Sequence, residues 1–419
     1  MKYQSLRGTH DILPEETPAW QYIEKKIHEK FGSCGFCEIR TPAIEQTELF
    51  MRSIGDQTDI VSKEMYSFQD KGGRNIALRP EATASVVRAA IEHNLIAKDK
   101  ISKLYYIGPM FRYERPQAGR FRQFYQAGIE LFGTSSALAD AEVVLAGIIL
   151  FNSLGLRSLE VEINSVGCKK CRPAYEEELK KYLAANSSKL CADCNERKEK
   201  NILRVLDCKN ESCKKVIFKA PSLEAMLCEE CKSHFEEFSG SLSSFGVTVS
   251  VNDKLVRGLD YYTKTTFEII SKELGAQNAV CGGGRYDDLI EELGGPATPA
   301  VGMAIGLERL LFVMASQKLL PEPGKELDIY IAAIGHDAQK KALQQVFELR
   351  KSGISAETDL SGKSLKSQLK TADGLGARYV LIIGEDEMKK GSFSLRNMKT
   401  AQQKEIRMEE LYREIEPTC

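Results

Sequence analysis

Side chains suited to a charged, flat ligand gather between residues 111 and 130, where the sequence reads FRYERPQAGRFRQFYQAGIE. Aromatic and β-branched residues lie on both sides of a break at 115–120 that contains Pro and Gly, which predicts a β-hairpin with a basic loop. Because side chains alternate across a strand, each strand places charged and aromatic groups on one face. Residues predicted to share such a face are Arg112 and Glu114 in the first strand, and Arg122, Phe124, Gln126, Gly128 and Glu130 in the second.

This face offers arginine for phosphate, an aromatic ring for stacking and carboxylate for an ammonium group. One interpretation is therefore a site for an anionic ligand with a flat ring and an amine. The other is a solvated hairpin with surface ion pairs, because most charges on a strand face water.

A second candidate lies at 75–93, NIALRPEATASVVRAAIEH. The pattern predicts a strand that ends near Leu78 and a helix that begins near Pro80. Glu81 and Thr83 then lie in the first helical turn, where free backbone N–H groups favour anions. Ordinary helix capping is the alternative explanation for the same residues.

A third candidate is LVRGLDYYTKTTFEI at 255–269. Read as a strand, it places Tyr262 and Glu268 on one face. Arg257 stands beside a glycine, which allows a tight backbone there.

Two glycine-containing segments follow. Residues 282–284 are three glycines followed by Arg285, which we expect to form a flexible loop because glycines alone carry no phosphate specificity. In AVGMAIGLERLLFVM (300–314), a strand is predicted to break at Gly306, and a helix follows with Arg309 in its first turn. An arginine there suits a phosphate, and an exposed helix arginine is the alternative.

Nucleophilic acyl catalysis is disfavoured by what these segments lack. The five histidines lie outside the segments 111–130, 255–269 and 282–289, and no GxSxG or cysteine-with-histidine pattern coincides with those segments. Attack of a carboxylate on a phosphate is different, because its nucleophile is already ionised. The protein then positions the reactants and stabilises the spreading charge, and arginines at separate positions meet that need.

Eight of the 12 cysteines lie between residues 168 and 231, as three CxxC pairs and one wider pair. The sulfurs of a CxxC reach one tetrahedral ion, so two pairs form a structural zinc site. The pairs predict one such site or two, and the expected zinc ligands are Cys191, Cys194, Cys208, Cys213, Cys228 and Cys231. Reduced core cysteines in a lysine-rich helical insertion are the alternative.

Length and composition limit the remaining possibilities. At one domain per about 150 residues, 419 residues predict about three domains. Lys and Arg number 58 against 59 Asp and Glu, so a nucleic-acid surface would have to be a local patch. The longest apolar run, at 141–151, is too short to span a membrane. No signal peptide is expected, so the chain is predicted to be cytoplasmic, with reduced cysteines.

Helices and strands can be expected around these candidates. A helix should follow with Thr17 as its N-cap and Pro18 at its first helical position, and FGSCGFCEIRTPAIE (31–45) should end it and lead into a strand. Prolines near 321 mark a linker, after which strands and helices alternate to about residue 385. That alternation predicts a small, mainly parallel sheet covered by helices.

FRYE, a basic loop and RQFYQAGIE together resemble motif 2 of the class II aminoacyl-tRNA synthetases, in the form found in histidyl-tRNA synthetases. Residues 255–269 and 282–289 resemble the histidine-specific signatures of that family, residues 31–45 resemble motif 1 and residues 300–314 resemble motif 3. The resemblance covers nearly the whole chain, the cysteine-rich region standing apart.

The resemblance implies a role for each matching residue. Arg112 and Arg257 are expected to be catalytic and to hold the α-phosphate and the histidine carboxylate. Histidine is expected to contact Glu81, Thr83, Arg112, Gln126, Glu130, Arg257, Tyr261 and Tyr262. ATP is expected to contact Arg112, Glu114, Phe124 and Arg309. Gln117, in the hairpin loop, is expected to touch the acceptor end of the tRNA.

The resemblance also implies the architecture. It is an α/β protein, more closely an α+β catalytic core with an antiparallel sheet flanked by helices, a Cys-rich insertion and a small C-terminal α/β domain. The expected limits are 1–167 and 246–322 for the catalytic core, 168–245 for the insertion and 327–419 for an anticodon-binding domain.

The implied activity is that of a histidine–tRNA ligase, a homodimer that uses ATP with Mg²⁺ and acts on L-histidine and tRNA(His). A catalytically inactive, histidine-sensing regulatory subunit of histidine biosynthesis is the competing interpretation. Such subunits typically lack the C-terminal domain and have eroded motifs, whereas this chain retains both. A zinc-dependent RNA-binding protein would leave the histidine-type signatures unexplained.

Overall fold

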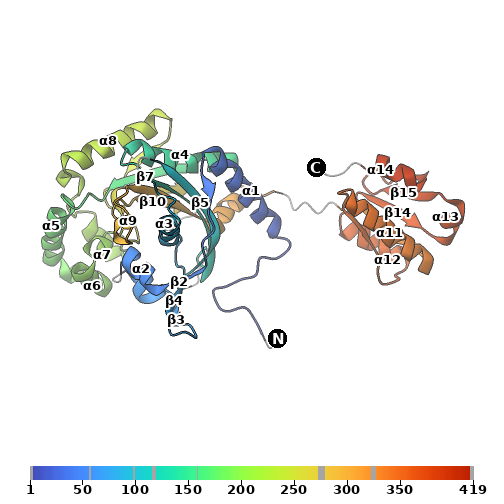
Figure 1. Ribbon diagram of the computed structural model, residues 1–419, viewed down its shortest axis with the longest axis horizontal. Coiled ribbons are helices and arrows are strands. Elements are labelled where there is room, and N and C mark those ends of the chain that lie inside the picture. Colours follow the sequence, from blue (N-terminus) through green and yellow to red (C-terminus); the bar gives the residue numbers. More distant parts are fainter. Residues whose placement is uncertain are drawn as a thin grey trace. The chain divides into compact units, whose positions relative to one another are not determined.

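A computed structural model of the chain describes residues 3–55, 58–97, 100–115, 119–157, 159–271, 279–321 and 327–415. The chain forms two compact units, Met1–Pro321 and Glu322–Cys419 (Figure 1). Within the described residues, no helix is both long and apolar enough to cross a membrane.

An eight-stranded sheet organises the first unit, with strand order β1-β5-β6-β11-β10-β9-β7-β8. Its five central pairings are antiparallel, and only the two edge pairings, β1 with β5 and β7 with β8, are parallel. The strands are β1 (Cys37–Glu38), β5 (Ser102–Phe111), β6 (Gln123–Phe132), β7 (Leu159–Ser165), β8 (Val249–Val251), β9 (Thr263–Ser271), β10 (Ala279–Arg285) and β11 (Ala300–Gly306).

The helices of this unit lie on both faces of the sheet. Outside the cysteine-rich region they are α1 (Thr17–Ser33), α2 (Thr47–Ile54), η1 (Ile60–Glu64), α3 (Thr83–Glu92), α4 (Ala137–Ser153), α9 (Leu289–Glu292) and α10 (Leu307–Ser316). A small second sheet has the order β2-β4-β3, from β2 (Ile44–Gln46), β3 (Ser67–Gln69) and β4 (Asn75–Leu78).

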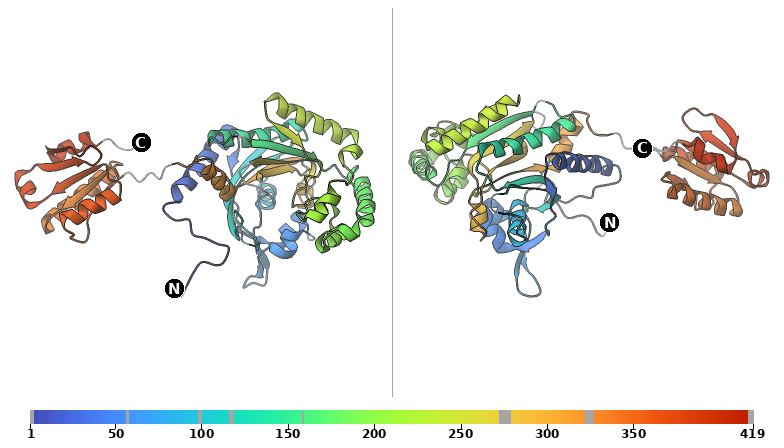
Figure 2. Two further views of the ribbon diagram at one scale, coloured as in Figure 1. Left: turned by 180° about the vertical axis from the view of Figure 1, so that it is seen from behind. Right: turned by 45° about the horizontal axis from the view of Figure 1, so that its top comes forward.

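One face of the large sheet is apolar and carries the main core. Ala127, Ile129 and Leu131 of β6 alternate with polar or small residues and pack, with Met303 and Ile305 of β11, into one buried cluster. Buried residues of α1, α4, α10 and a further helix, α8 (Glu229–Ser244), complete this cluster. Figures 1 and 2 show α1, α4 and α8 running along this outer face, while α3 lies inside the concave side.

The segment between β7 and β8 leaves the sheet after β7 and returns to it at β8, and the predicted insertion, residues 168–245, falls within this segment. Its helices are α5 (Arg172–Ala185), η2 (Ser187–Lys189), α6 (Ala192–Lys200), η3 (Ile202–Val205), α7 (Glu211–Ile217), η4 (Glu224–Met226) and α8 (Glu229–Ser244). It has a core of its own, in which Tyr175, Leu179 and Leu183 pack with cysteines of the segment 191–213.

The second unit is a five-stranded sheet with order β13-β12-β14-β15-β16. Its elements are β12 (Ile329–Ala333), α11 (His336–Lys351), β13 (Ala356–Thr358), α12 (Leu365–Gly374), β14 (Tyr379–Ile383), α13 (Glu385–Lys390), β15 (Phe393–Asn397), β16 (Gln403–Ile406), η6 (Met408–Glu410) and α14 (Leu411–Glu414). The first three strands are parallel, as alternation predicts, but β15 and β16 are antiparallel additions, so the expectation of a mainly parallel sheet was only half right.

Two local predictions from the sequence were wrong. Residues 282–284 are not a flexible loop, because they lie inside β10 and pair with β9 and β11 on both sides. The segment 255–269 is not one strand, since β9 begins only at Thr263. Lys264 has a φ of 50°, and the β9–β10 register shifts between Gly284 and Arg285, so Tyr262 lies outside the strand alternation.

Candidate active site

The candidate site lies on the inner face of the large sheet, opposite the main core. Cross-strand partners share a face, and Glu130 pairs with Leu104 and Gly302, while Gly128 pairs with Tyr106 and Ala304. Gln126, Gly128 and Glu130 therefore lie on one face of β6, as the sequence predicts. Residues of α3 pack against one part of this face.

Glycines on this face make room for buried polar side chains. A Cβ at Gly302 would collide with the Glu130 carboxylate, one at Gly128 with the Tyr106 hydroxyl, and one at Gly282 with the Arg257 guanidinium. Since real Cβ atoms do not approach so closely, the sheet surface at these positions is bare backbone on which functional groups lie.

Glu130 is the centre of a buried polar group. Its carboxylate accepts hydrogen bonds from the Thr83 hydroxyl, at 2.7 Å, and from the Tyr286 hydroxyl, and its side chain is 1% exposed. Burial raises the pKa of Glu130 to about 8, the bonds from Tyr286 and Thr83 oppose that rise, and the charge of Glu81 adds to it. The carboxyl group is thus poised to exchange a proton near neutral pH.

Glu81 caps the start of α3 and also lies next to the buried polar group around Glu130. It precedes the helix, and its carboxylate accepts from the backbone N–H groups of Thr83, at 2.6 Å, and Ala84, at 2.9 Å. Burial raises the pKa of Glu81, while these bonds lower it. The carboxylate is held at a helix N-terminus, directly beside the Thr83 and Glu130 pair.

Arg257 lies across Gly282, and its guanidinium donates to the Glu268 carboxylate. Burial disfavours its charge, but Glu268 and Tyr262 outweigh burial and raise the pKa of Arg257. Its Nε is buried and makes no hydrogen bond within the described residues, and the same holds for Oε1 of Gln126. Unpaired buried polar atoms carry a free-energy cost that a ligand would relieve.

Tyr261 and Tyr262 form the aromatic wall beside these groups. Their ring centroids are 4.7 Å apart, and Tyr261 lies edge-on to Tyr286 at 5.5 Å. Burial raises the pKa of both phenols, so they remain neutral hydrogen-bonding groups.

The hairpin brings the charged residues of β5 and β6 together, although β5 ends at Phe111 and Arg112 and Glu114 lie beyond it. Arg112 donates from Nε to the Pro80 carbonyl at 2.8 Å, and its guanidinium carbon lies 5.3 Å from the centre of the Phe124 ring. The Arg112 Nη1 and Glu114 Oε1 atoms are 3.7 Å apart. Gln117 lies outside the described residues.

Arg309 occupies the first turn of α10, as predicted, and donates to the Ala279 carbonyl at 3.0 Å. Its neighbour Glu308 accepts from the backbone N–H of Tyr125 at 2.9 Å. Burial raises the pKa of Glu308 to about 7, which its hydrogen bonds with backbone N–H groups oppose. This contact ties the motif-3 segment to β6.

Two further residues of this face were missed by the sequence interpretation. Arg79 lies over Gly108 and donates to the Pro109 and Thr41 carbonyls, each at 2.9 Å. Tyr106 lies over Gly128. Strand parity in the lead-in LYYIGPM was the available signal, because Tyr106 and Gly108 fall on the same face as Met110.

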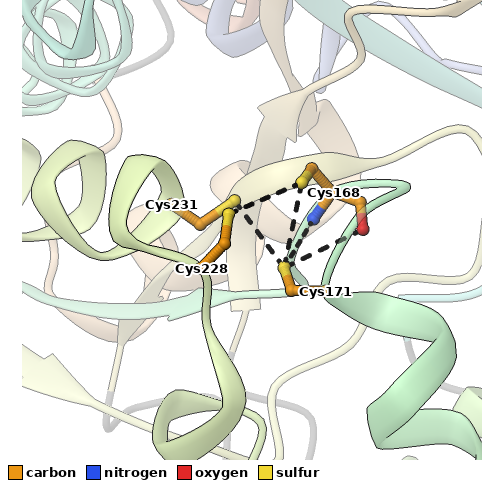
Figure 3. A group of neighbouring side chains, drawn as sticks. All are labelled: Cys168, Cys171, Cys228 and Cys231. Carbon is orange, nitrogen blue, oxygen red and sulfur yellow. Dashed lines mark hydrogen bonds between the residues drawn. The ribbon is translucent and has the colours of Figure 1, made fainter.

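The cysteines of the insertion gather in two groups of four. The neck cluster is Cys168, Cys171, Cys228 and Cys231, and the inner cluster is Cys191, Cys194, Cys208 and Cys213. The six expected ligands are all among these eight cysteines, and the sequence left their grouping open. In the structure Cys228 and Cys231 lie with Cys168 and Cys171, and the other four expected ligands form the inner cluster. The start of the insertion and the start of α8 meet there, and all four side chains point toward one another (Figure 3).

A cavity of about 610 Å³ separates the insertion from the segment that carries Arg257 and Tyr262. Arg172, Lys180 and Arg204 line it from the insertion, and acidic residues of both parts line it as well.

Comparisons with known proteins agree with this geometry. The family model described as histidyl-tRNA synthetase matches residues 8–310, and the one described as anticodon binding domain matches residues 328–417. Histidine–tRNA ligase of Halothermothrix orenii is 50% identical over 416 residues, 99% of each chain. The enzyme of Thermodesulfovibrio yellowstonii is 52% identical over 411 residues, 98% of this chain and 97% of its own.

Among solved structures, apo histidyl-tRNA synthetase of S. aureus superposes with a TM-score of 0.83 at 36% identity, covering 99% of each chain. The antiparallel sheet, with arginines and carboxylates on its inner face, is that of a class II aminoacyl-tRNA synthetase. Within that class, the chain belongs to the histidyl-tRNA synthetase family.

Proposed function

We propose that this chain is a histidine–tRNA ligase. It condenses L-histidine with ATP to histidyl-adenylate and pyrophosphate, then transfers the histidyl group to the 3′ end of tRNA(His). The observation that carries the proposal is the buried Glu130 carboxylate, held by Thr83 and Tyr286 beside Glu81 and the paired tyrosines.

The pocket supplies acceptors where histidine has donors. Glu130 and Tyr262 take the two imidazole nitrogens, Tyr261 contributes to the aromatic wall, and Glu81, Thr83 and Gln126 take the ammonium group. The buried Oε1 of Gln126, which has no hydrogen-bond partner in the described part of the chain, supports this role. A site that bonds both ring nitrogens rejects isosteres without them, because its own buried groups would lose their partners.

Arginine performs the activation chemistry. The histidine carboxylate attacks the α-phosphorus as the bond to pyrophosphate breaks, and no base is needed because the nucleophile is already ionised. Arg112 and Arg257 hold the carboxylate and α-phosphate and stabilise the charge that spreads over the phosphate oxygens. Glu268 fixes the Arg257 guanidinium in place before the substrates bind.

ATP lies along the hairpin in this proposal. Phe124 stacks on the adenine, Glu114 binds its edge, and Arg309 holds the γ-phosphate. Magnesium arrives with ATP and is held mainly through the phosphates, where it supplies charge neutralisation.

The proposal extends to tRNA and to assembly. The unit Glu322–Cys419 binds the anticodon, and Gln117 touches the acceptor end. Residues 168–245 act as a separate insertion domain, whereas 1–167 and 246–322 form the catalytic core and 327–419 the anticodon-binding domain. The chain acts as a homodimer in the cytoplasm, and the insertion binds structural zinc through its cysteines.

ATP–pyrophosphate exchange without tRNA, with each of the twenty amino acids in turn, tests the proposal. Exchange with histidine alone is expected. The Arg257→Ala variant should lower that exchange by at least about a hundredfold, the scale of one lost donor to a developing anion. Arg350→Ala, in the second unit, is the control and should retain exchange. Near-normal exchange by Arg257→Ala would remove that residue from the mechanism, and histidine binding without exchange would favour the regulatory-subunit alternative.

A further inference from the structure

The two cysteine clusters have the geometry of filled metal sites. In each cluster the four sulfur atoms lie within 4.8 Å of one another. We infer that each chain binds two zinc ions, one in the neck cluster and one in the inner cluster, and that the neck ion fixes the segment carrying Tyr262.

Sulfur separations support tetrathiolate coordination. Cys168 Sγ lies 3.8 Å from both Cys171 Sγ and Cys228 Sγ, and Cys171 Sγ lies 3.8 Å from Cys231 Sγ. Four sulfurs at about 2.3 Å from a tetrahedral zinc stand about 3.8 Å apart. A disulfide would bring them to about 2.0 Å, so these pairs are not disulfides.

The inner cluster repeats the arrangement. Cys191 Sγ and Cys208 Sγ are 3.9 Å apart, and three of its four cysteines are buried. Its ligands come from α6, from the turn after η3 and from α7, none of which is long enough to bury a large core. A metal ion supplies the cross-link that such a small helical segment lacks.

Backbone donors surround the sulfurs as they do around thiolates. The N–H groups of Cys168 and Lys170 donate to Cys171 Sγ and Cys168 Sγ at 3.3 and 3.4 Å, and the Cys191 N–H donates to Cys213 Sγ at 3.1 Å. Such outer contacts orient ligands and offset the negative charge of four thiolates on one ion.

The neck cluster is joined to the histidine pocket by the residues next to its ligands. Arg172 follows Cys171 and donates to the carbonyls of Val166, at 2.9 Å, and Tyr262, at 2.5 Å. Glu230, between Cys228 and Cys231, accepts from Lys264 Nζ at 3.0 Å. Each CxxC segment therefore holds residues 262–264, where the chain enters β9. The first segment does so through Arg172, and the second through Glu230.

Backbone bonds close the same junction. The Lys264 N–H donates to the Gly167 carbonyl at 2.8 Å, and the Val166 N–H donates to the Lys264 carbonyl at 2.7 Å. Lys264 has the left-handed φ of 50°, which most side chains avoid, so surrounding contacts must maintain it. Without the ion, the two CxxC segments that carry Arg172 and Glu230 would no longer be cross-linked to each other.

Metal analysis of the full chain, purified from medium without added metal other than trace elements, tests the two sites. Two zinc ions per chain are expected. The paired variants Cys228→Ser/Cys231→Ser and Cys208→Ser/Cys213→Ser should each retain one. Cys34→Ser/Cys37→Ser, a CxxC outside both clusters, is the matched control and should retain two. No zinc, one zinc, or iron in place of zinc in the unaltered chain would overturn the two-site inference.

Cobalt provides a check that does not depend on the variants folding. Chain grown with Co²⁺ should show the thiolate-to-cobalt absorption of two tetrahedral sulfur sites, and absence of that absorption in cobalt-containing protein would exclude tetrathiolate binding.

The inference that the neck ion fixes the segment carrying Tyr262 rests on the proposed function, and Arg172 provides its test. Arg172→Met should keep two zinc ions, raise KM for histidine about tenfold, the scale of one lost charged hydrogen bond, and leave KM for ATP nearly unchanged. Unchanged KM for histidine would overturn the positioning role. If the unaltered chain shows no histidine exchange, the proposed function fails while the zinc content still decides the metal sites.

Discussion

Replacing Glu130 by glutamine should change how stability depends on pH. Burial raises the pKa of this carboxyl group from its ordinary 4.5 to about 8. Between those values the folded protein binds more protons than the unfolded chain, so the group lowers the free energy of unfolding progressively as pH rises. This loss of stability is absent below about pH 4.5 and reaches its full size above about pH 8.

The magnitude follows from the two pKa values. From about pH 5.5 to pH 7.5, ionisation of Glu130 in the unfolded chain alone costs about 2.5 kcal/mol of stability. Glutamine has the same shape and does not ionise, so the variant escapes this loss. For the unit Met1–Pro321, an unfolding entropy near 2.1 cal/mol/K per residue converts 2.5 kcal/mol to about 4 °C in Tm.

Thermal melts of Glu130→Gln and of the unaltered chain, at matched pH and scan rate, measure this difference in stability. The Tm of Glu130→Gln minus that of the unaltered chain should increase by about 4 °C over the range, because titrating groups that do not interact with Glu130 cancel in the difference. Glu308→Gln is the comparison, since the pKa of Glu308 is raised to about 7 and its curve should level off about one pH unit lower. A Glu130 difference that does not vary with pH would refute the reasoning.

Two further substitutions test the sheet itself. Gly282→Ala places a methyl group where the Arg257 guanidinium lies, so exchange with histidine should fall about a hundredfold with little loss of secondary structure, and normal exchange would show that the arginine has room to move. Asp140→Asn leaves the fully buried Arg285 without its main counter-charge and should lower the free energy of unfolding by about 3 kcal/mol in denaturant titrations, whereas a change under about 1 kcal/mol would mean that Asp287 and the carbonyl groups suffice.

Local pattern was enough to predict the elements whose signals are periodic. Trp20, Ile23, Ile27 and Phe31 are all buried on one side of α1, as their spacing indicates. The hairpin and its polar face were predicted because alternation survives over the whole of β6. Glu81 and Thr83 were placed at a helix start by a proline and a cap pattern, and the structure puts them beside Glu130.

Features that depend on contacts between distant parts of the chain could not be predicted from local sequence patterns. A run of three glycines has no propensity for a strand, and 282–284 forms one because it pairs with β9 and β11 on both sides. Glycine is needed there because a Cβ would collide with Arg257 or with atoms of the neighbouring strands. The cysteine pairing depends on the chain returning from residue 171 to residue 228, a contact that spacing alone does not contain. The β9 boundary was misplaced because a left-handed lysine interrupts the alternation.

The neck cluster also has a consequence for how the chain can vary. The chain between Cys171 and Cys228 begins and ends at the same place in the fold. Sulfur atoms from its two ends, Cys168 with Cys228 and Cys171 with Cys231, lie 3.8 Å apart. Segments whose ends lie close together can be lengthened, shortened or exchanged without displacing their host. The strand connections of the large sheet therefore do not depend on the length of the chain between Cys171 and Cys228. A domain with adjacent termini could be grafted between α5 and α8, at the cost of the contacts that Arg197 and Asn201 make with Asp59 and Asp260.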